Sequence, residues 1–473
     1  MSKGQNVGDV YTATLGRISA QGEDRARLGM EAIMWIAYSE RPLEPDELCQ
    51  ALGVEIGLPD LDNDNAPSIR TILNCGLGLV TVDSSSSKAR LVHFTLQEHI
   101  MANPTLFCTP HSMIAEICLT YLNFGCIRGL SPTLRPLPPT TPFLEYASHY
   151  WGAHARRQTS KKVISLALDL LDGFDAHISC ELLLRQEYNR RIFPVDSYPA
   201  PLNCTALHAG AFLGVPEIMA SLLKIDKWDL NATDRDHRTA LLCAAEVGHD
   251  ALVKMLLEQE DVNPHIADHD GRTPLSWAAG NGYEGIVEML LERNDVNPDT
   301  ADMYERTPLS IAAERGHEKI VRVLLERNDV NPDTVDWSGR TPLAWAVGEE
   351  IMPPDTEEEH ERVVKILLER NDVNPNSADK SGRTPLDWAA SNGSARVLRM
   401  LLERKIFNPN TADESGQTPF PWATGSGWRR AVTGQAESPD LPSKSGLAER
   451  LSWPFATNPP TLPEPPFKKI RRL

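Results

Sequence analysis

A tripeptide, Thr-[Pro/Ala]-[Leu/Phe], recurs along the second half of this chain and constrains its fold more than any other feature. Its copies begin at Thr205, Thr239, Thr273, Thr307, Thr341, Thr384 and Thr418. Successive copies lie 34 residues apart, except for one interval of 43 residues. Such a period indicates a stack of similar supersecondary units, in which an insertion is tolerated when it falls in a loop.

Each unit carries the same helix signals in the same order. Threonine caps a helix and proline suits its first turn. A glycine then ends the first helix, and a leucine pair lies on the apolar face of the second. In one unit these residues are Thr273, Pro274, Gly282 and Leu290, with Asp302 at the closing turn. We therefore expect two short helices and a hairpin in every unit.

The first unit carries the tetrapeptide Thr205-Ala206-Leu207-His208, and the repeated segment resembles the ankyrin family. Later units replace the histidine by Leu242, Ser276, Ser310, Ala344 and Asp387. The resemblance implies a mostly α-helical solenoid over residues 201–434, with about seven repeats, the last of them incomplete. It also implies a concave surface of hairpin tips and first helices, where family members bind proteins.

The positions that vary among ankyrin repeats supply the expected partner-binding residues. Here they are Arg272, Arg306, Arg340, Arg383, His269, Met303, Tyr304 and Trp337. Arginine and aromatic side chains are over-represented among interface hot spots. We hypothesise that this row binds an acidic or aromatic-rich protein segment. Alternatively, the arginines are solvated or pair with the aspartates that close each unit.

Two further features of the repeats leave alternatives open. Four tryptophans follow the tripeptide, and they either form a stacking platform for bases or pack between helices. They are Trp277, Trp345, Trp388 and Trp422. An acidic, proline-broken insertion around residues 353–359 is expected to be a loop between the two helices of one unit, either solvated or a second contact.

The first 105 residues show the signals of three helices, a β-hairpin and a further helix. Helices are expected over 25–38, 44–52 and 68–74, strands over 79–82 and 90–94, and a final helix from about residue 96. This is the element order of a winged-helix domain. Residues 1–105 are therefore predicted to be winged-helix-like.

Short sequence motifs in this region resemble those of one family of receptors. Arg41-Pro42-Leu43 and His93-Phe94-Thr95-Leu96-Gln97-Glu98 resemble the winged helix of fungal NACHT–ankyrin, NLR-like proteins. Phe143-Leu144-Glu145-Tyr146-Ala147 resembles their helical connector, here residues 106–200. No Gly-x-x-x-x-Gly-Lys-[Ser/Thr] phosphate loop occurs, so the chain resembles the sensor part of such a receptor without its NTPase domain.

Charge and composition argue against several other functions. The net charge of −18 disfavours general binding to nucleic acid or anionic membrane. The candidate recognition helix of the winged helix carries only Arg70, so DNA recognition is a minor alternative. No apolar stretch approaches the ~20 residues needed to span a bilayer. The eight scattered cysteines fit a reduced, intracellular protein.

Catalytic and metal-binding motifs are not found in the sequence. There is no Gly-x-Ser-x-Gly and no His-Glu-x-x-His. His149 and His154 lie five residues apart, off one helical face, which argues against a shared metal. We therefore expect no catalytic residues, no cofactor and no metal site.

The last segment, residues 435–473, is rich in proline and is expected to be disordered. Its final basic run, Lys468, Lys469, Arg471 and Arg472, offers nuclear import as an alternative to a cytoplasmic location. The sequence as a whole predicts a monomeric, non-enzymatic protein-interaction module or scaffold. The alternatives are the sensor portion of an NLR-like signalling NTPase that has lost its NACHT domain or acts with a separate one, and DNA-associated regulation through the winged helix.

Overall fold

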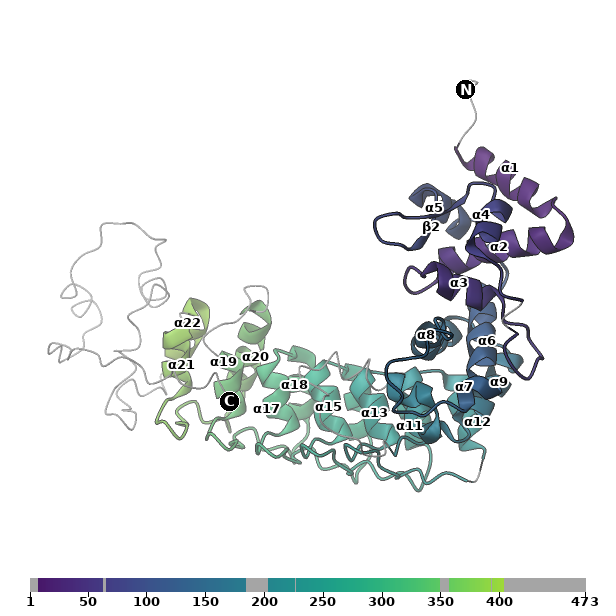
Figure 1. The fold of residues 1–473 in the computed structure, drawn as a ribbon. Coiled ribbons are helices and arrows are strands. Elements are labelled where there is room, and N and C mark those ends of the chain that lie inside the picture. Colours follow the sequence, from purple (N-terminus) through teal and green to yellow (C-terminus); the bar gives the residue numbers. More distant parts are fainter. Residues whose placement is uncertain are drawn as a thin grey trace, which may run out of the picture. The chain divides into compact units, whose positions relative to one another are not determined.

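A computed structural model describes residues 7–62, 65–183, 203–225, 227–348, 357–392 and 394–403 (Figure 1). The chain divides into two compact units, Met1–Pro274 and Leu275–Leu473. The proline-rich segment, the basic run at its end and the unit that begins at Thr418 lie outside the described residues.

The first unit begins with helices around a small antiparallel hairpin. The elements are α1 (Val7–Ser19), α2 (Glu23–Tyr38), α3 (Pro45–Leu52), α4 (Ile69–Cys75), β1 (Val80–Val82), β2 (Ala89–Leu91) and α5 (Phe94–Met101). Val80 pairs with Leu91, and the hairpin is joined by a turn. The expected winged-helix order is therefore present, and α1 adds a helix that the sequence did not predict.

The prediction that the second strand runs to residue 94 is wrong, because a helix cap intervenes. The His93 imidazole accepts a hydrogen bond from the Thr95 backbone N–H at 3.3 Å, so α5 begins at Phe94. A side chain that satisfies a free N–H at a helix start fixes where the helix begins. The alternating pattern of the segment gave no sign of this cap.

The core of this part comes from one face of several elements. Leu15 of α1, Ile33 of α2, Val80 of β1, and Leu96 and Ile100 of α5 are buried together. Burial of apolar side chains is the main stabilising term in such a domain. The four-residue spacing of the buried positions in α5 is that of one helical face.

Helices that follow the winged-helix part have a different, aromatic core. They are η2 (Pro104–Leu106), α6 (Pro110–Leu122), α7 (Gly125–Arg128), α8 (Leu144–Arg157), α9 (Lys161–Leu171) and η3 (Phe174–Ala176). Trp35 of α2 packs edge-on against Phe143 and Tyr146. Gln50 of α3 accepts hydrogen bonds from the Tyr121 hydroxyl at 3.0 Å and the Phe143 N–H at 3.1 Å. These contacts join the helical connector to the winged-helix part.

Two helix pairs complete the first unit. They are α11 (Ala206–Leu213) with α12 (Pro216–Leu223), and α13 (Ala240–Val247) with α14 (Asp250–Leu257). As predicted, Gly214 and Gly248 end the first helices in the left-handed conformation, with φ of 68° and 87°. A Cβ at Gly214 would lie 2.3 Å from His249, so the glycine is also needed for the close approach of the next repeat.

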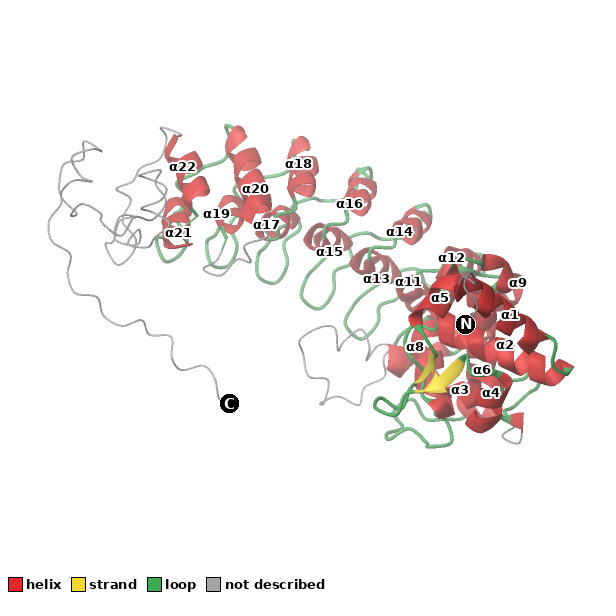
Figure 2. Cartoon of the chain, turned by 90° about the horizontal axis from the view of Figure 1, so that it is seen from above, coloured by secondary structure: helices red, strands yellow, loops and turns green. Residues whose placement is uncertain are grey.

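Among its described residues, the second unit has four helix pairs, and Figure 2 shows their helices in two rows. The first helices are α15 (Pro274–Asn281), α17 (Pro308–Glu314), α19 (Pro342–Val347) and α21 (Pro385–Asn392). The second helices are α16 (Glu284–Leu291), α18 (Glu318–Glu326), α20 (Glu357–Glu369) and α22 (Ala395–Glu403). The extra residues fall at the junction of α19 and α20, as expected, and residues 349–356 lie outside the described residues. The expectation that the loop extends to residue 359 is wrong, because α20 begins at Glu357.

Small and branched residues fill the space between the rows. Ala312 and Ala313 of α17 are fully buried, and Ile320, Val321 and Leu324 of α18 form its buried face. The alanines let the helices approach closely, and the aliphatic face of the second helix covers them. For this repeat the structure therefore confirms both expectations, that alanines of the first helix allow close packing and that the second helix has one buried apolar face.

Candidate functional site

The hairpins before α13, α15, α17, α19 and α21 are each organised by an aspartate. The Asp302 Oδ1 atom accepts hydrogen bonds from the backbone N–H groups of Tyr304 and Arg306, both at 2.9 Å. The same pair of bonds, at 2.8–3.0 Å, recurs at Asp234, Asp268, Asp336 and Asp379. Each aspartate thus fixes a turn of the kind that Asx side chains favour. Its other oxygen, Oδ2, is left for a side chain of the repeat.

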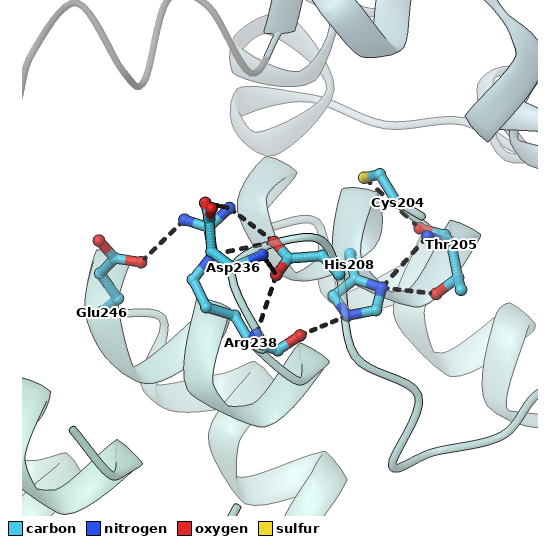
Figure 3. A network of polar contacts seen from close by, with 7 residues as sticks. Cys204, Thr205, His208, Asp236, Arg238 and Glu246 are labelled. Carbon is cyan, nitrogen blue, oxygen red and sulfur yellow. Dashed lines mark hydrogen bonds and ion pairs between the residues drawn. The ribbon is translucent and has the colours of Figure 1, made fainter. Parts of the chain in front are cut away.

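In one repeat of the first unit, Oδ2 binds a buried arginine (Figure 3). Arg238 donates from Nε and Nη2 to Asp234 Oδ2 at 2.9 and 2.6 Å, and its Nη1 lies 3.5 Å from Glu246. The Arg238 side chain is only 3% exposed. A buried arginine of this kind must have its donors satisfied, because desolvation of the charge is costly. Arg238 is therefore committed to the fold.

Arg306 repeats this arrangement in the second unit. It donates from Nε and Nη2 to Asp302 Oδ2 at 3.1 and 2.9 Å, and from Nη1 to Glu314 at 3.2 Å. Its side chain is 16% exposed, and its guanidinium lies 5.2 Å from the centre of the Tyr304 ring. The expected alternative of pairing with a nearby aspartate thus describes the contacts of Arg306.

A second arrangement occurs where a tryptophan follows the tripeptide. The indole N–H of Trp345 donates to Asp336 Oδ2, and that of Trp388 to Asp379 Oδ2, both at 3.0 Å. The Arg340 guanidinium then lies over both rings, 3.9 Å from the centre of Trp388 and 4.7 Å from that of Trp345. Arg383 lies 4.9 Å from Trp388. These half-buried tryptophans pack within the repeats, with arginine on their faces.

Three large side chains remain exposed on adjoining hairpin tips of the second unit, and we refer to them as the tip surface. Met303 is 59% exposed, Tyr304 42% and Trp337 57%. The backbone N–H of Trp337 donates to the backbone carbonyl of Tyr304 at 3.0 Å, which holds the two tips side by side. Figure 2 shows the hairpin loops beyond the row of first helices. The structure therefore brings together three of the predicted binding residues.

Two predicted residues belong to the first unit. The His269 ring lies 6.0 Å from that of His237, and its backbone N–H donates to the Asp236 carbonyl at 2.9 Å. The Arg272 backbone N–H donates to Asp268 at 2.8 Å. His269 is exposed and Arg272 is half-buried, so His269 is the more accessible of the two.

The first helix of the stack is capped by the histidine of the family tetrapeptide. The His208 Nδ1 atom accepts from the Thr205 N–H at 3.2 Å, while Nε2–H donates to the Arg238 carbonyl at 2.7 Å (Figure 3). Burial lowers the pKa of His208 below its usual 6.5. In a later repeat Asp387 takes this place, accepting from the Thr384 N–H at 2.8 Å. The change of residue therefore preserves the cap.

Three histidines that the sequence analysis did not single out link successive repeats. Each lies at the start of the second helix of a repeat. Its Nε2–H donates to a carbonyl in the first helix of the repeat before. The bonds are His249 to Phe212 at 3.3 Å, His317 to Gly280 at 3.1 Å and His360 to Glu314 at 2.9 Å. A glycine directly before His249 and His317 was the available signal.

His149 and His154, which the sequence spacing argued against as a pair, have different partners in the structure. His149 bonds to the Leu182 carbonyl at 3.0 Å and lies apart from the site that His154 forms. His154 instead meets His111, with 2.8 Å between their Nδ1 atoms. These residues are 43 positions apart, so no local spacing could have indicated the pair. Glu40 completes the group.

Comparison with known protein families agrees with this architecture. The family model for ankyrin repeats matches residues 207–302, 293–352 and 356–433. The family model for the winged helix domain of GPI inositol-deacylase matches residues 18–107. The chain therefore contains ankyrin repeats preceded by a winged helix domain. Ankyrin repeats serve protein–protein interaction, so the tip surface lies in a protein-binding fold.

Several solved structures of ankyrin repeats are similar to part of the chain. The ankyrin repeat domain of Bcl-3, of the IkappaB protein family, is 22% identical with a TM-score of 0.41, covering 48% of this chain and 96% of that one. The ankyrin repeat protein EF0377 is 23% identical with a TM-score of 0.38, covering 42% and 96%. An ankyrin repeat domain from Acinetobacter baumannii AYE is 29% identical with a TM-score of 0.37, again covering 42% and 96%.

No curated protein matches the chain. Within the described residues, no helix combines the length and apolar character needed to cross a membrane.

Proposed function

We propose that this chain is a non-enzymatic interaction module whose repeats bind a protein segment at the tip surface. The observation that carries the proposal is the exposure of Met303, Tyr304 and Trp337, at 59%, 42% and 57%, on adjoining hairpins. Aromatic side chains held on a rigid scaffold supply contact area at little entropic cost. A solvent-facing group of this kind is typical of a binding surface.

Between the acidic and the aromatic-rich segment, the local charges favour the aromatic-rich one. Arg306, the arginine nearest Tyr304, already meets the carboxylates of Asp302 and Glu314. An acidic partner would have to compete with these ion pairs. A partner that inserts an aromatic or aliphatic anchor beside Trp337 needs no such exchange. We therefore propose a segment with apolar anchors as the occupant.

The experiment first identifies partners and then measures them with purified proteins. Proximity labelling in the native organism gives candidates, and each is titrated against the full chain and a Met303→Ser/Trp337→Ser variant. We expect at least about a tenfold loss of affinity, because hot-spot truncations cost about 2 kcal/mol or more. The matched control is Ile56→Ser/Leu58→Ser, two exposed apolar residues of the winged helix domain, 47% and 41% exposed.

The control variant is expected to bind as the unchanged chain does. If the tip variant bound its partner with unaltered affinity, or if both double variants lost affinity equally, the tip surface would not be the binding site. Circular dichroism of the variants separates loss of a contact from loss of the fold.

A second proposal keeps the NLR-like alternative. It is supported by the sharing of one compact unit among the winged helix domain, the helical connector and the first two helix pairs. Such a unit suits a sensor portion that passes a signal to a separate NACHT-containing chain. The same labelling experiment tests it: enrichment of such an NTPase, retained in the tip variant, is the expected result. If no such NTPase were among the labelled proteins, this second proposal would be rejected and only the first, the interaction module, would stand.

A further inference from the structure

We infer that Glu40, His111 and His154 form a zinc site between the winged helix domain and the helical connector. Glu40 follows α2, while His111 and His154 belong to α6 and α8. One possible ligand atom from each residue lies within 4.8 Å of the other two. The two imidazoles are closer still, with 2.8 Å between their Nδ1 atoms.

The donor set has the chemistry that Zn²⁺ prefers. Zinc is bound by imidazole nitrogen and carboxylate oxygen, commonly by three protein ligands and one water. Hard cations such as Mg²⁺ and Ca²⁺ favour an all-oxygen set, which this group does not provide. Two nitrogens and one carboxylate therefore indicate a borderline transition metal, and zinc is the common one.

Metal binding needs a free lone pair on each imidazole. In the structure one Nδ1–H is shared between the rings. When zinc binds, both rings take the Nε2–H tautomer, so the two Nδ1 lone pairs face the ion and no proton is released.

Neighbouring groups already orient the ligands. The His154 Nε2 atom lies 3.0 Å from the Tyr146 hydroxyl, the partner that an Nε2–H tautomer needs. The Arg157 guanidinium holds the Glu40 carboxylate, with 2.6 Å from Nη1 to Oε1 and 3.1 Å from Nη2 to Oε2. Such outer contacts fix the ligand geometry of metal sites. The positive charge of Arg157 reduces the affinity, so a moderate rather than a very tight site is expected.

The geometry requires only a small adjustment. Donors around a tetrahedral zinc ion lie about 3.3 Å apart when zinc–nitrogen distances are about 2.0 Å. The histidine pair is slightly closer than this, and the carboxylate must move by about 1 Å. The Glu40 side chain is 17% exposed, which gives it room to move and gives an ion a path from solvent. A bound ion would then tie α2, α6 and α8 together.

The test uses the purified full chain after treatment with a chelator. Zn²⁺ is titrated by calorimetry, and Co²⁺ replaces it to report geometry by its visible absorption. We expect one ion per chain and a tetrahedral Co²⁺ spectrum. Glu40→Gln and His111→Asn are each expected to weaken Zn²⁺ binding at least about tenfold, because each removes one of three ligands. The control is His265→Asn, an exposed histidine of a repeat hairpin, which should bind as the unchanged chain does.

Two results would overturn the inference. One is a chain that binds no Zn²⁺ at micromolar concentrations. The other is Zn²⁺ binding that survives both ligand substitutions, since it would then arise elsewhere on the chain. If His111→Asn impairs folding, the partly exposed Glu40→Gln variant alone decides the outcome. Melting with and without Zn²⁺ provides a further readout, with a higher midpoint expected only when all three ligands are present.

Discussion

Two kinds of ankyrin repeat can be distinguished among the described residues. They differ in the side chain that binds the second carboxylate oxygen of the hairpin aspartate. In the first kind, Arg238 and Arg306 place their guanidinium groups on the aspartate that organises the hairpin. In the second kind, Trp345 and Trp388 donate their indole N–H to that oxygen instead. The arginine of the second kind then lies on a tryptophan face.

The two kinds also differ at the hairpin itself. The residue before the arginine is His237 or Glu305 in the first kind, with φ of 60° and 59°. In the second kind it is Gly339 or Gly382, with φ of 83° and 77°. All four positions are left-handed, a conformation that costs a non-glycine residue about 1 kcal/mol or more. The first kind therefore carries backbone strain at this position, and the second avoids that strain by placing glycine there.

The comparison teaches that one repeated arginine has two different roles. Where tryptophan is absent, the arginine is part of the fold and its charge is neutralised by carboxylates. Where tryptophan is present, the arginine covers an aromatic face, and Arg340 and Arg383 are half-buried there. A row of arginines in the sequence is therefore not a row of equivalent binding residues.

The largest effect is expected from Arg238→Ala. Removal of one partner of a buried ion pair leaves uncompensated charge, so the free energy of unfolding should fall by about 3–5 kcal/mol. The more exposed Arg306→Ala should lose less, about 1–2 kcal/mol. Denaturant unfolding of the full chain, followed by circular dichroism, measures both. Equal losses would mean that burial does not separate the two arginines.

Acid should affect the first repeat through His208. Its pKa is lowered mainly by burial, while the charge of Asp234 acts to raise it and that of Arg238 to lower it. Because the unfolded chain binds the proton more readily, stability is complete above pH 6.5 and falls as the pH drops below that value. Unfolding midpoints of the chain and of His208→Gln, measured from pH 7.5 to 5, check this. The variant should show a shallower dependence, and parallel curves would contradict the assignment.

The hairpin glycines provide a third contrast. Gly339→Ala should cost about 1–3 kcal/mol, because the left-handed backbone disfavours a Cβ and the new atom would lie 2.8 Å from the Lys380 nitrogen. Glu305→Gly should change stability by only about 0.5 kcal/mol, since relief of strain offsets the entropy of glycine. Thermal midpoints of both variants test the difference. A larger loss for Glu305→Gly would show that this tip is not strained.

The smallest effect concerns the arginine above the tryptophans. Arg340→Met retains an apolar stem but removes the charge, so a loss of about 0.5–1 kcal/mol is expected from the missing cation–π contact. Lys319→Met is the control, because Lys319 is 76% exposed and pairs only at the surface with Glu284. Its unfolding midpoint should hardly change. An indistinguishable pair of midpoints would mean that the aromatic contact contributes nothing measurable.

The sequence by itself determined the repeat architecture, because its signals are local. The tripeptide at Thr307, the alanines at 312 and 313 and the leucines at 324 and 325 each act within one turn or one helix. Their period alone predicted the helix pairs and the position of the insertion. The winged-helix order could be predicted for the same reason, apart from a strand end that a histidine cap decided.

Only the tertiary structure decided which side chains meet. Arg306 binds the aspartate of its own hairpin, whereas Arg383 lies on a tryptophan five positions later in the chain. The repeat pattern of small and apolar residues does not reveal which of these two contacts an arginine makes. The group of Glu40, His111 and His154 is assembled from the end of α2 and from α6 and α8, which are distant in the chain. Contacts of this kind arise from packing between elements, and their energy is not encoded in any local window of sequence.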